Sequence, residues 1–104
     1  MEITTHEKAE DSESVFVVSL AGRFDAHEVD SFNEQLLAKI DSGESHIGVD
    51  LAGVNFLDST ALASLTSGMK RCREAGGDLV LMNPSDPVRV ILELTRLDRA
   101  FAII

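Results

Sequence analysis

The hydrophobic residues of this 104-residue chain change their spacing several times, and that change limits the fold more than any other feature. An apolar run at residues 15–20 is rich in β-branched side chains, so it predicts a buried strand that stops at Ala21 and Gly22. The weaker segment at residues 2–8 is expected to pair with that run through a polar connection at residues 9–14. The chain therefore begins with two strands.

From Glu28 onward the apolar residues recur with the period of a helix, and strands and helices then alternate. A first helix carries Val29, Phe32, Leu36, Leu37 and Ile40 on one face and ends at residues 41–43. A strand is then expected at residues 46–51, before Ala52 and Gly53.

A second helix is expected from residues 58–60 to Gly76 and Gly77, and its inner stripe consists of Leu62, Leu65, Met69 and Cys72. The remaining predicted elements are a strand at residues 78–83, a helix that starts at Ser85, Asp86 and Pro87, and a final edge strand at residues 101–104.

Two strands followed by alternating helices and strands predict an α/β fold with a mixed, mostly parallel sheet of about four or five strands packed with helices. A chain of 104 residues buries enough apolar surface for one core, so we expect a single domain over residues 1–104.

Composition narrows the class of partner. Hydrophobic residues make up 44% and charged residues 26%, as in soluble globular domains. The net charge of −9 would repel nucleic acid and anionic lipid, so neither is an expected partner. The N-terminus resembles no signal peptide and no apolar stretch is long enough to span a bilayer, which favours a cytoplasmic protein without membrane insertion.

The sequence offers no metal or cofactor site. His6, His27 and His46 are scattered without ligand spacing, and the single cysteine, Cys72, lies in a helical apolar stripe where a buried structural thiol is expected. Glycine-rich phosphate loops and the common hydrolase motifs are absent, so we expect neither a cofactor nor catalysis.

The block Asp58-Ser59-Thr60 allows three interpretations. All three residue types are ordinary helix N-caps. A phosphate on Ser59 would also be favoured there, because free N–H groups and the helix dipole attract anions. Thirdly, Ser59 could be a hydrolase nucleophile, provided that the fold aimed a histidine at it.

A resemblance to a known family distinguishes these interpretations. Residues 54–62, read with the strand before them and the Gly76-Gly77 segment after them, are similar to the signature region of STAS domains. Residues 20–25 resemble the strand-ending Leu-x-Gly-x-Leu/Phe-Asp element of that family, and residues 94–104 resemble its usual C-terminal segment. The chain is thereby identified as a member of the anti-sigma factor antagonist group of STAS proteins.

That resemblance implies a STAS-like fold and a regulatory binding protein that is not an enzyme. The unphosphorylated antagonist would bind an anti-sigma factor that is also an ATP-binding serine/threonine kinase, which releases the sigma factor for transcription. Phosphorylation by the kinase would eject the antagonist, and a serine phosphatase would reset it. The alternative is a non-switching STAS subunit of a transporter or a signalling scaffold, in which Ser59 is only a cap.

The resemblance also assigns roles to residues. Ser59 matches the phosphorylated serine, and Thr60 is the fallback phosphoacceptor. Asp58 matches the preceding acidic residue, and Asp25 matches the acidic residue at the end of the early strand, although it could equally be the N-cap of the first helix. Ala61 stands where the family commonly has glycine, so its methyl group is expected to narrow the partner set or slow phosphorylation. Partner binding is thus expected at Asp25, Asp58, Ser59, Thr60 and Ala61.

Overall fold

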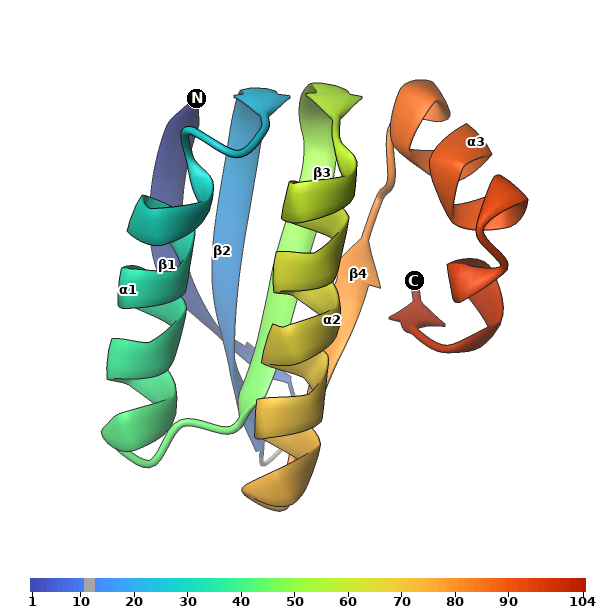
Figure 1. The fold of residues 1–104 in the computed structure, drawn as a ribbon. Coiled ribbons are helices and arrows are strands. Elements are labelled where there is room, and N and C mark those ends of the chain that lie inside the picture. Colours follow the sequence, from blue (N-terminus) through green and yellow to red (C-terminus); the bar gives the residue numbers. More distant parts are fainter. Residues whose placement is uncertain (11–12) are drawn as a thin grey trace.

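The computed structural model describes residues 1–10 and 13–104, and the side chains of all of these except residues 8–10, 13 and 14. Strands and helices follow one another along the chain in the order that Figure 1 shows. The elements are β1 (Glu2–Glu10), β2 (Glu13–Phe24), α1 (Val29–Asp41), β3 (His46–Leu57), α2 (Ser59–Glu74), β4 (Asp78–Met82), α3 (Asp86–Leu94), the 3₁₀ helix η1 (Leu97–Arg99) and β5 (Ala102–Ile103).

The five strands form one sheet in the order β1-β2-β3-β4-β5. β1 pairs antiparallel with β2, and every other pair is parallel. The helices α1 and α2 lie next to each other on one face of the sheet, while α3 and η1 follow β4 (Figure 1). The predicted α/β class is confirmed, as is the pairing of the first two strands. Residues 11 and 12 of the predicted connection lie outside the described residues.

The core lies between the sheet and the helices α1 and α2. The predicted stripe of α2 is buried at Leu62, Leu65, Met69 and Cys72. On α1, Phe32 and Leu36 are buried, and the Phe32 ring packs against the ring of Phe24 at a centroid distance of 5.0 Å. The periods read from the sequence therefore identified the faces that pack together.

Three strands are longer than predicted. β1 runs to Glu10 and β2 begins at Glu13, so residues 9–10 and 13–14 of the predicted polar connection belong to paired strands. β2 and β3 extend further at their other ends, because glycines that resembled strand ends are accommodated by irregular pairing. β2 continues through Gly22 to Phe24, and β3 continues through Gly53 to Leu57. The register between them shifts twice over this stretch, as it does at β-bulges. A Cβ atom at Gly53 would lie 2.9 Å from the Cβ atom of Ala21, so the close approach of the two strands requires glycine.

The C-terminal elements agree with prediction apart from two details. α3 begins at Asp86 as expected, but the Ser85 hydroxyl donates a hydrogen bond to the carbonyl oxygen of Val54 in β3 and does not cap the helix. The turn η1 was not anticipated. The final edge strand is confirmed, since β5 pairs in parallel with β4.

Gly77 gives a test of this packing. A Cβ atom built on Gly77 would overlap the carbonyl oxygen of Ser45, which accepts a hydrogen bond from the Asp78 amide at 3.0 Å. We expect Gly77→Ala to lower the free energy of unfolding by about 3 kcal/mol in urea denaturation. The control is Gly76→Ala, where φ is +90° but the space is open, and about 1 kcal/mol is expected. Equal losses in the two variants would contradict the close approach at Gly77.

Cys72 gives a pH-dependent test. The thiol is fully buried, and burial raises its pKa from 9.0 to about 11, with a smaller contribution from the negative charge of Asp78. Because the unfolded chain loses this proton first, the stabilisation is present below about pH 9 and is lost as the pH rises to about 11. In urea denaturation, wild type should lose stability relative to Cys72→Ala over that interval. A constant difference between the two proteins would show that the thiol titrates alike in both states.

Candidate functional site

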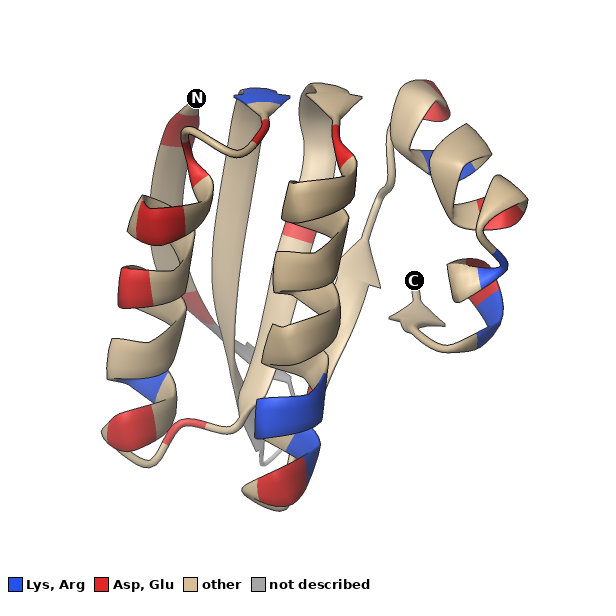
Figure 2. Cartoon of the chain, in the orientation of Figure 1, with Lys and Arg blue, Asp and Glu red and all other residues tan. Residues whose placement is uncertain are grey.

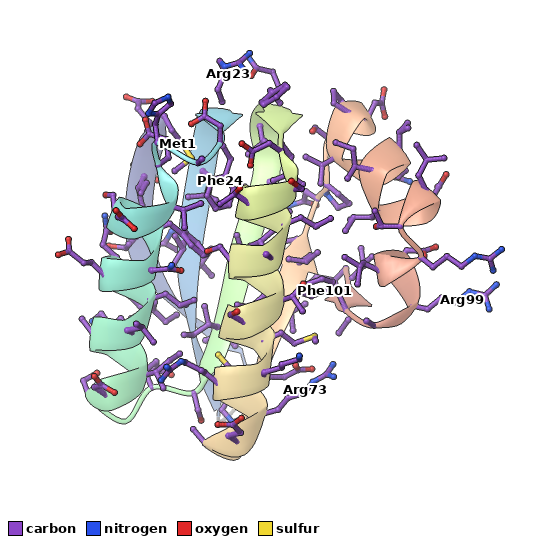
Figure 3. The ribbon with its side chains drawn as sticks, in the orientation of Figure 1. Met1, Arg23, Phe24, Arg73, Arg99 and Phe101 are labelled. Carbon is purple, nitrogen blue, oxygen red and sulfur yellow. The ribbon has the colours of Figure 1, made fainter. Side chains whose placement is uncertain are left out.

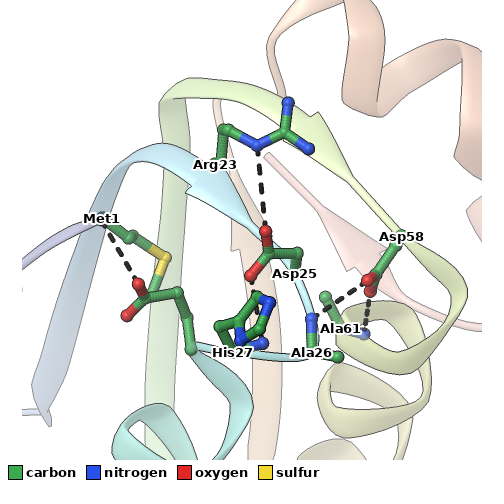
Figure 4. Close-up of polar contacts among 8 residues, drawn as sticks. Met1, Arg23, Asp25, Ala26, His27, Asp58 and Ala61 are labelled. Carbon is green, nitrogen blue, oxygen red and sulfur yellow. Dashed lines mark hydrogen bonds and ion pairs between the residues drawn. The ribbon is translucent and has the colours of Figure 1, made fainter.

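The carboxyl ends of β2 and β3 bring Asp25 and Asp58 to the same edge of the sheet. Phe24 and Leu57 are paired at the end of the ladder, and the two aspartates follow them directly. The Asp58 amide also donates to the carbonyl oxygen of Phe24, with a nitrogen to oxygen distance of 3.3 Å. Extended pairing of the strands is therefore what places these acidic residues together (Figure 4).

The Asp58 carboxylate joins the start of α2 to the connection between β2 and α1. Asp58 is the N-cap of α2, with an extended backbone, and its Oδ1 accepts a hydrogen bond from the Ala61 amide at 2.8 Å. Its Oδ2 accepts a second hydrogen bond from the Ala26 amide at 3.0 Å (Figure 4). One side chain thus stabilises the helix start and fixes the neighbouring turn.

Asp25 organises the turn before α1 and does not cap that helix. Its Oδ1 accepts a hydrogen bond from the His27 amide at 3.1 Å, and its carbonyl oxygen accepts one from the Glu28 amide at 3.0 Å. The N-cap position of α1 belongs to Glu28, which makes no side-chain capping bond. The N-cap interpretation of Asp25 is therefore wrong, whereas its expected place at the end of the early strand is confirmed, next to the Ala26 amide that binds Asp58.

Ser59 and Thr60 are the first two residues of α2, and both are exposed. Asp58 performs the capping, and neither hydroxyl forms a hydrogen bond within the part of the chain that the structure describes. Among the same residues, the backbone amides of Ser59 and Thr60 also have no acceptor. The interpretation of Ser59 as a cap is wrong, because the hydroxyl is not used for that purpose.

Ala61 does not contribute its side chain to the surface. The residue is fully buried, and its amide is bound to Asp58. The expectation that its methyl group would narrow the approach of a partner does not hold, since that methyl group has no exposed area. The structure therefore brings four of the five predicted residues to the accessible edge and turns the fifth towards the core.

The hydrolase interpretation has no geometric support. Both oxygens of Asp58 accept hydrogen bonds from backbone amides, so in the described structure this carboxylate does not orient a histidine.

Among the described residues, no group of three or more His, Cys, Asp or Glu side chains could hold a metal ion. The described helices also include none with the length and apolar character needed to cross a membrane.

The surface around Ser59 combines a shallow groove with an uneven charge distribution. The groove has a volume of about 430 Å³ and runs along α2 from Ser59 to Lys70, with Leu97 on its other side. Acidic residues lie along α1 and at the ends of β2 and β3, whereas basic residues gather at the far end of α2 (Figure 2). The exposed serine therefore sits beside the acidic part of the surface.

A second feature of this edge, the contact between Arg23 and Phe56, was not predicted from the sequence. Arg23 and Phe56 are partners in the ladder between β2 and β3, and the Arg23 guanidinium lies 4.0 Å from the centroid of the Phe56 ring. Each residue precedes a buried one, Phe24 or Leu57, and that alternation could have placed both on the outer side of the sheet. The two register shifts between the strands hid the pairing itself.

Comparison with known proteins matches almost the whole chain to one family. A family model described as STAS domain matches residues 7–104. The anti-sigma F factor antagonist of Paenibacillus polymyxa is 27% identical over 90 residues, which cover 86% of this chain and 77% of that protein.

Solved structures agree with the fold. A crystal structure of an anti-sigma factor antagonist from Mycobacterium paratuberculosis has a TM-score of 0.79 and 25% identity, and the match covers 98% of this chain and 85% of that one. The Bacillus cell fate determinant SpoIIAA in its phosphorylated form has a TM-score of 0.72 and 20% identity, with coverage of 97% and 91%.

The double role of Asp58 can be tested by its removal. We expect Asp58→Ala to lower the free energy of unfolding by about 1 to 2 kcal/mol and to accelerate hydrogen exchange at the Ala26 amide. Ser59→Ala is the matched control and should change stability by less than about 0.5 kcal/mol, because the Ser59 hydroxyl makes no hydrogen bond to any described residue. Urea denaturation and amide exchange by NMR measure the two effects, and unchanged exchange at Ala26 would show that the turn is held by other contacts.

Proposed function

The chain belongs to the STAS domain family, and from this premise we propose that it is an anti-sigma factor antagonist whose binding is switched off by phosphorylation of Ser59. The observation that carries the proposal is the exposed Ser59 hydroxyl. It does not cap α2, because the Asp58 side chain already occupies the N-cap position and binds the Ala61 amide. The name of the Paenibacillus polymyxa relative supports the antagonist role. The phosphorylated form of the Bacillus protein supports the view that this fold tolerates a phosphate.

The local chemistry suits a reversible phosphate. The amides of Ser59 and Thr60, which have no acceptor among the described residues, can donate to phosphate oxygens at the positive end of the α2 dipole. The modification adds about −1.5 to −2 charges beside Asp58 and Asp25, which already make this edge acidic. Leu62, Ala63 and Leu97 line the groove beside Ser59, so a phosphate there would place a strongly hydrated charge against a close apolar contact of the partner and disrupt that contact.

The proposed partners follow from this cycle. An anti-sigma factor that is also an ATP-binding serine/threonine kinase binds the edge and the groove along α2, and then modifies Ser59. A serine phosphatase restores the binding form. Because Asp25 and Asp58 flank that apolar contact, the kinase should present basic residues around it and not opposite the Ser59 hydroxyl, and the association should weaken as the salt concentration rises. The chain itself acts by binding and needs no catalytic group.

A pull-down from native cell lysate tests the proposal, with tagged wild type, Ser59→Ala and Ser59→Asp as bait and mass spectrometry to identify the captured proteins. We expect wild type and Ser59→Ala to retain an ATP-binding anti-sigma kinase and Ser59→Asp to lose it, because the added carboxylate mimics part of the phosphate charge. Thr60→Asp is the matched control for a charge at the neighbouring exposed position.

The other outcomes are equally informative. Retention of one transporter or scaffold protein by all variants would support the alternative of a non-switching STAS subunit. Loss of the kinase with Thr60→Asp but not with Ser59→Asp would move the phosphoacceptor to Thr60.

A further inference from the structure

Arg23 and Phe56 lie at the same edge as Ser59 but point to the outer side of the sheet. Their neighbours Phe24 and Leu57 are buried in the core beneath the helices, and successive side chains of a strand alternate in direction. β3 passes directly from Phe56 through Asp58 into α2, so the two features share one rim of the molecule.

The Arg23 side chain is held from two directions while its terminal nitrogens face solvent. Its guanidinium carbon lies 4.0 Å from the centroid of the Phe56 ring, and its Nε lies 3.8 Å from Oδ2 of Asp25. The other oxygen of Asp25 is bound to the His27 amide, so the support is itself fixed. The Arg23 side chain remains 62% exposed, which leaves the planar end of the guanidinium open to a ligand.

Arg23 is the one lysine or arginine between Lys8 and Lys39, and Asp25, Glu28 and Asp58 lie at the same edge. The Met1 ammonium is a second positive charge at this edge, but it is already paired with Glu28 at 3.6 Å (Figure 4). Figure 3 shows Arg23 projecting beyond the end of the sheet, far from Arg99. A partner that matches this edge must be mostly basic, and it must offer an acidic group opposite Arg23 to avoid a like-charge contact.

We propose that the Arg23 and Phe56 pair is a second anchor of the partner surface, which takes a carboxylate side chain of the anti-sigma factor. The inference rests on the proposed function. A guanidinium binds a carboxylate with two parallel hydrogen bonds, and one already held on an aromatic ring loses little freedom on binding. Arginine and aromatic residues are also the side chains that most often dominate interface energies. The anchor sets which kinase is recognised and does not depend on the state of Ser59.

The test measures affinity by calorimetry with the kinase that wild type retains in the pull-down. Arg23→Glu should weaken binding by about tenfold to a hundredfold, whereas Arg99→Glu, the same charge change at an exposed site away from the edge, should stay within about twofold. Arg23→Lys keeps the charge without the two-pronged geometry and should show an intermediate loss. Thermal melts of each variant check that the fold is intact.

Ser59→Ala as a background separates this anchor from the switch. The fold loss of affinity for the kinase caused by Arg23→Glu should be the same in Ser59→Ala as in wild type, because the anchor contacts the partner and not a phosphate. Equal affinities of Arg23→Glu and Arg99→Glu, or an effect that disappears with Ser59→Ala, would overturn the inference while leaving the proposed function in place. If wild type retains no ATP-binding kinase, the proposed function and the anchor both fall.

Discussion

The carboxylate of Asp58 holds together the two segments from which the proposed switch is built. One oxygen fixes the first turn of α2, where Ser59 is presented, and the other fixes the turn that carries Asp25. This arrangement depends in turn on β2 and β3 pairing as far as Phe24 and Leu57. In the proposed switch, a serine at a helix start fixed by these hydrogen bonds would offer the kinase one defined geometry, which the pairing of β2 and β3 maintains.

The fold could be predicted because its signals are local periods. The helical spacing from Leu62 to Cys72 predicts a helix, and the β-branched run of β2 predicts a strand. The resulting order of elements is compatible with few sheet topologies. The ends of β2 and β3 could not be predicted, because Gly22 and Gly53 look like terminators and act as points of irregular pairing. Their role depends on a neighbour distant in sequence.

The site was predicted only in part, because some of its features are local in sequence and others depend on residues distant in sequence. Asp58 and Ser59 are contiguous in a motif, so both could be located from the sequence. Which of the two caps α2 could not be predicted, and the structure shows that it is Asp58. Whether Ala61 faces a partner depends on the orientation of α2 against the core, and the structure shows it buried. The Arg23 and Phe56 contact depends on a register between two strands that no local signal encodes.

In the proposed function, recognition at Arg23 and regulation at Ser59 lie on different residues of the same edge. The proposed switch requires that a phosphate on Ser59 weakens binding, and this can be measured by calorimetry of the anti-sigma kinase with chain that carries phosphoserine at position 59 and with unmodified chain. We expect the phosphorylated chain to bind at least about a hundredfold more weakly, equivalent to about 2.7 kcal/mol. Equal affinity of the two forms would contradict it.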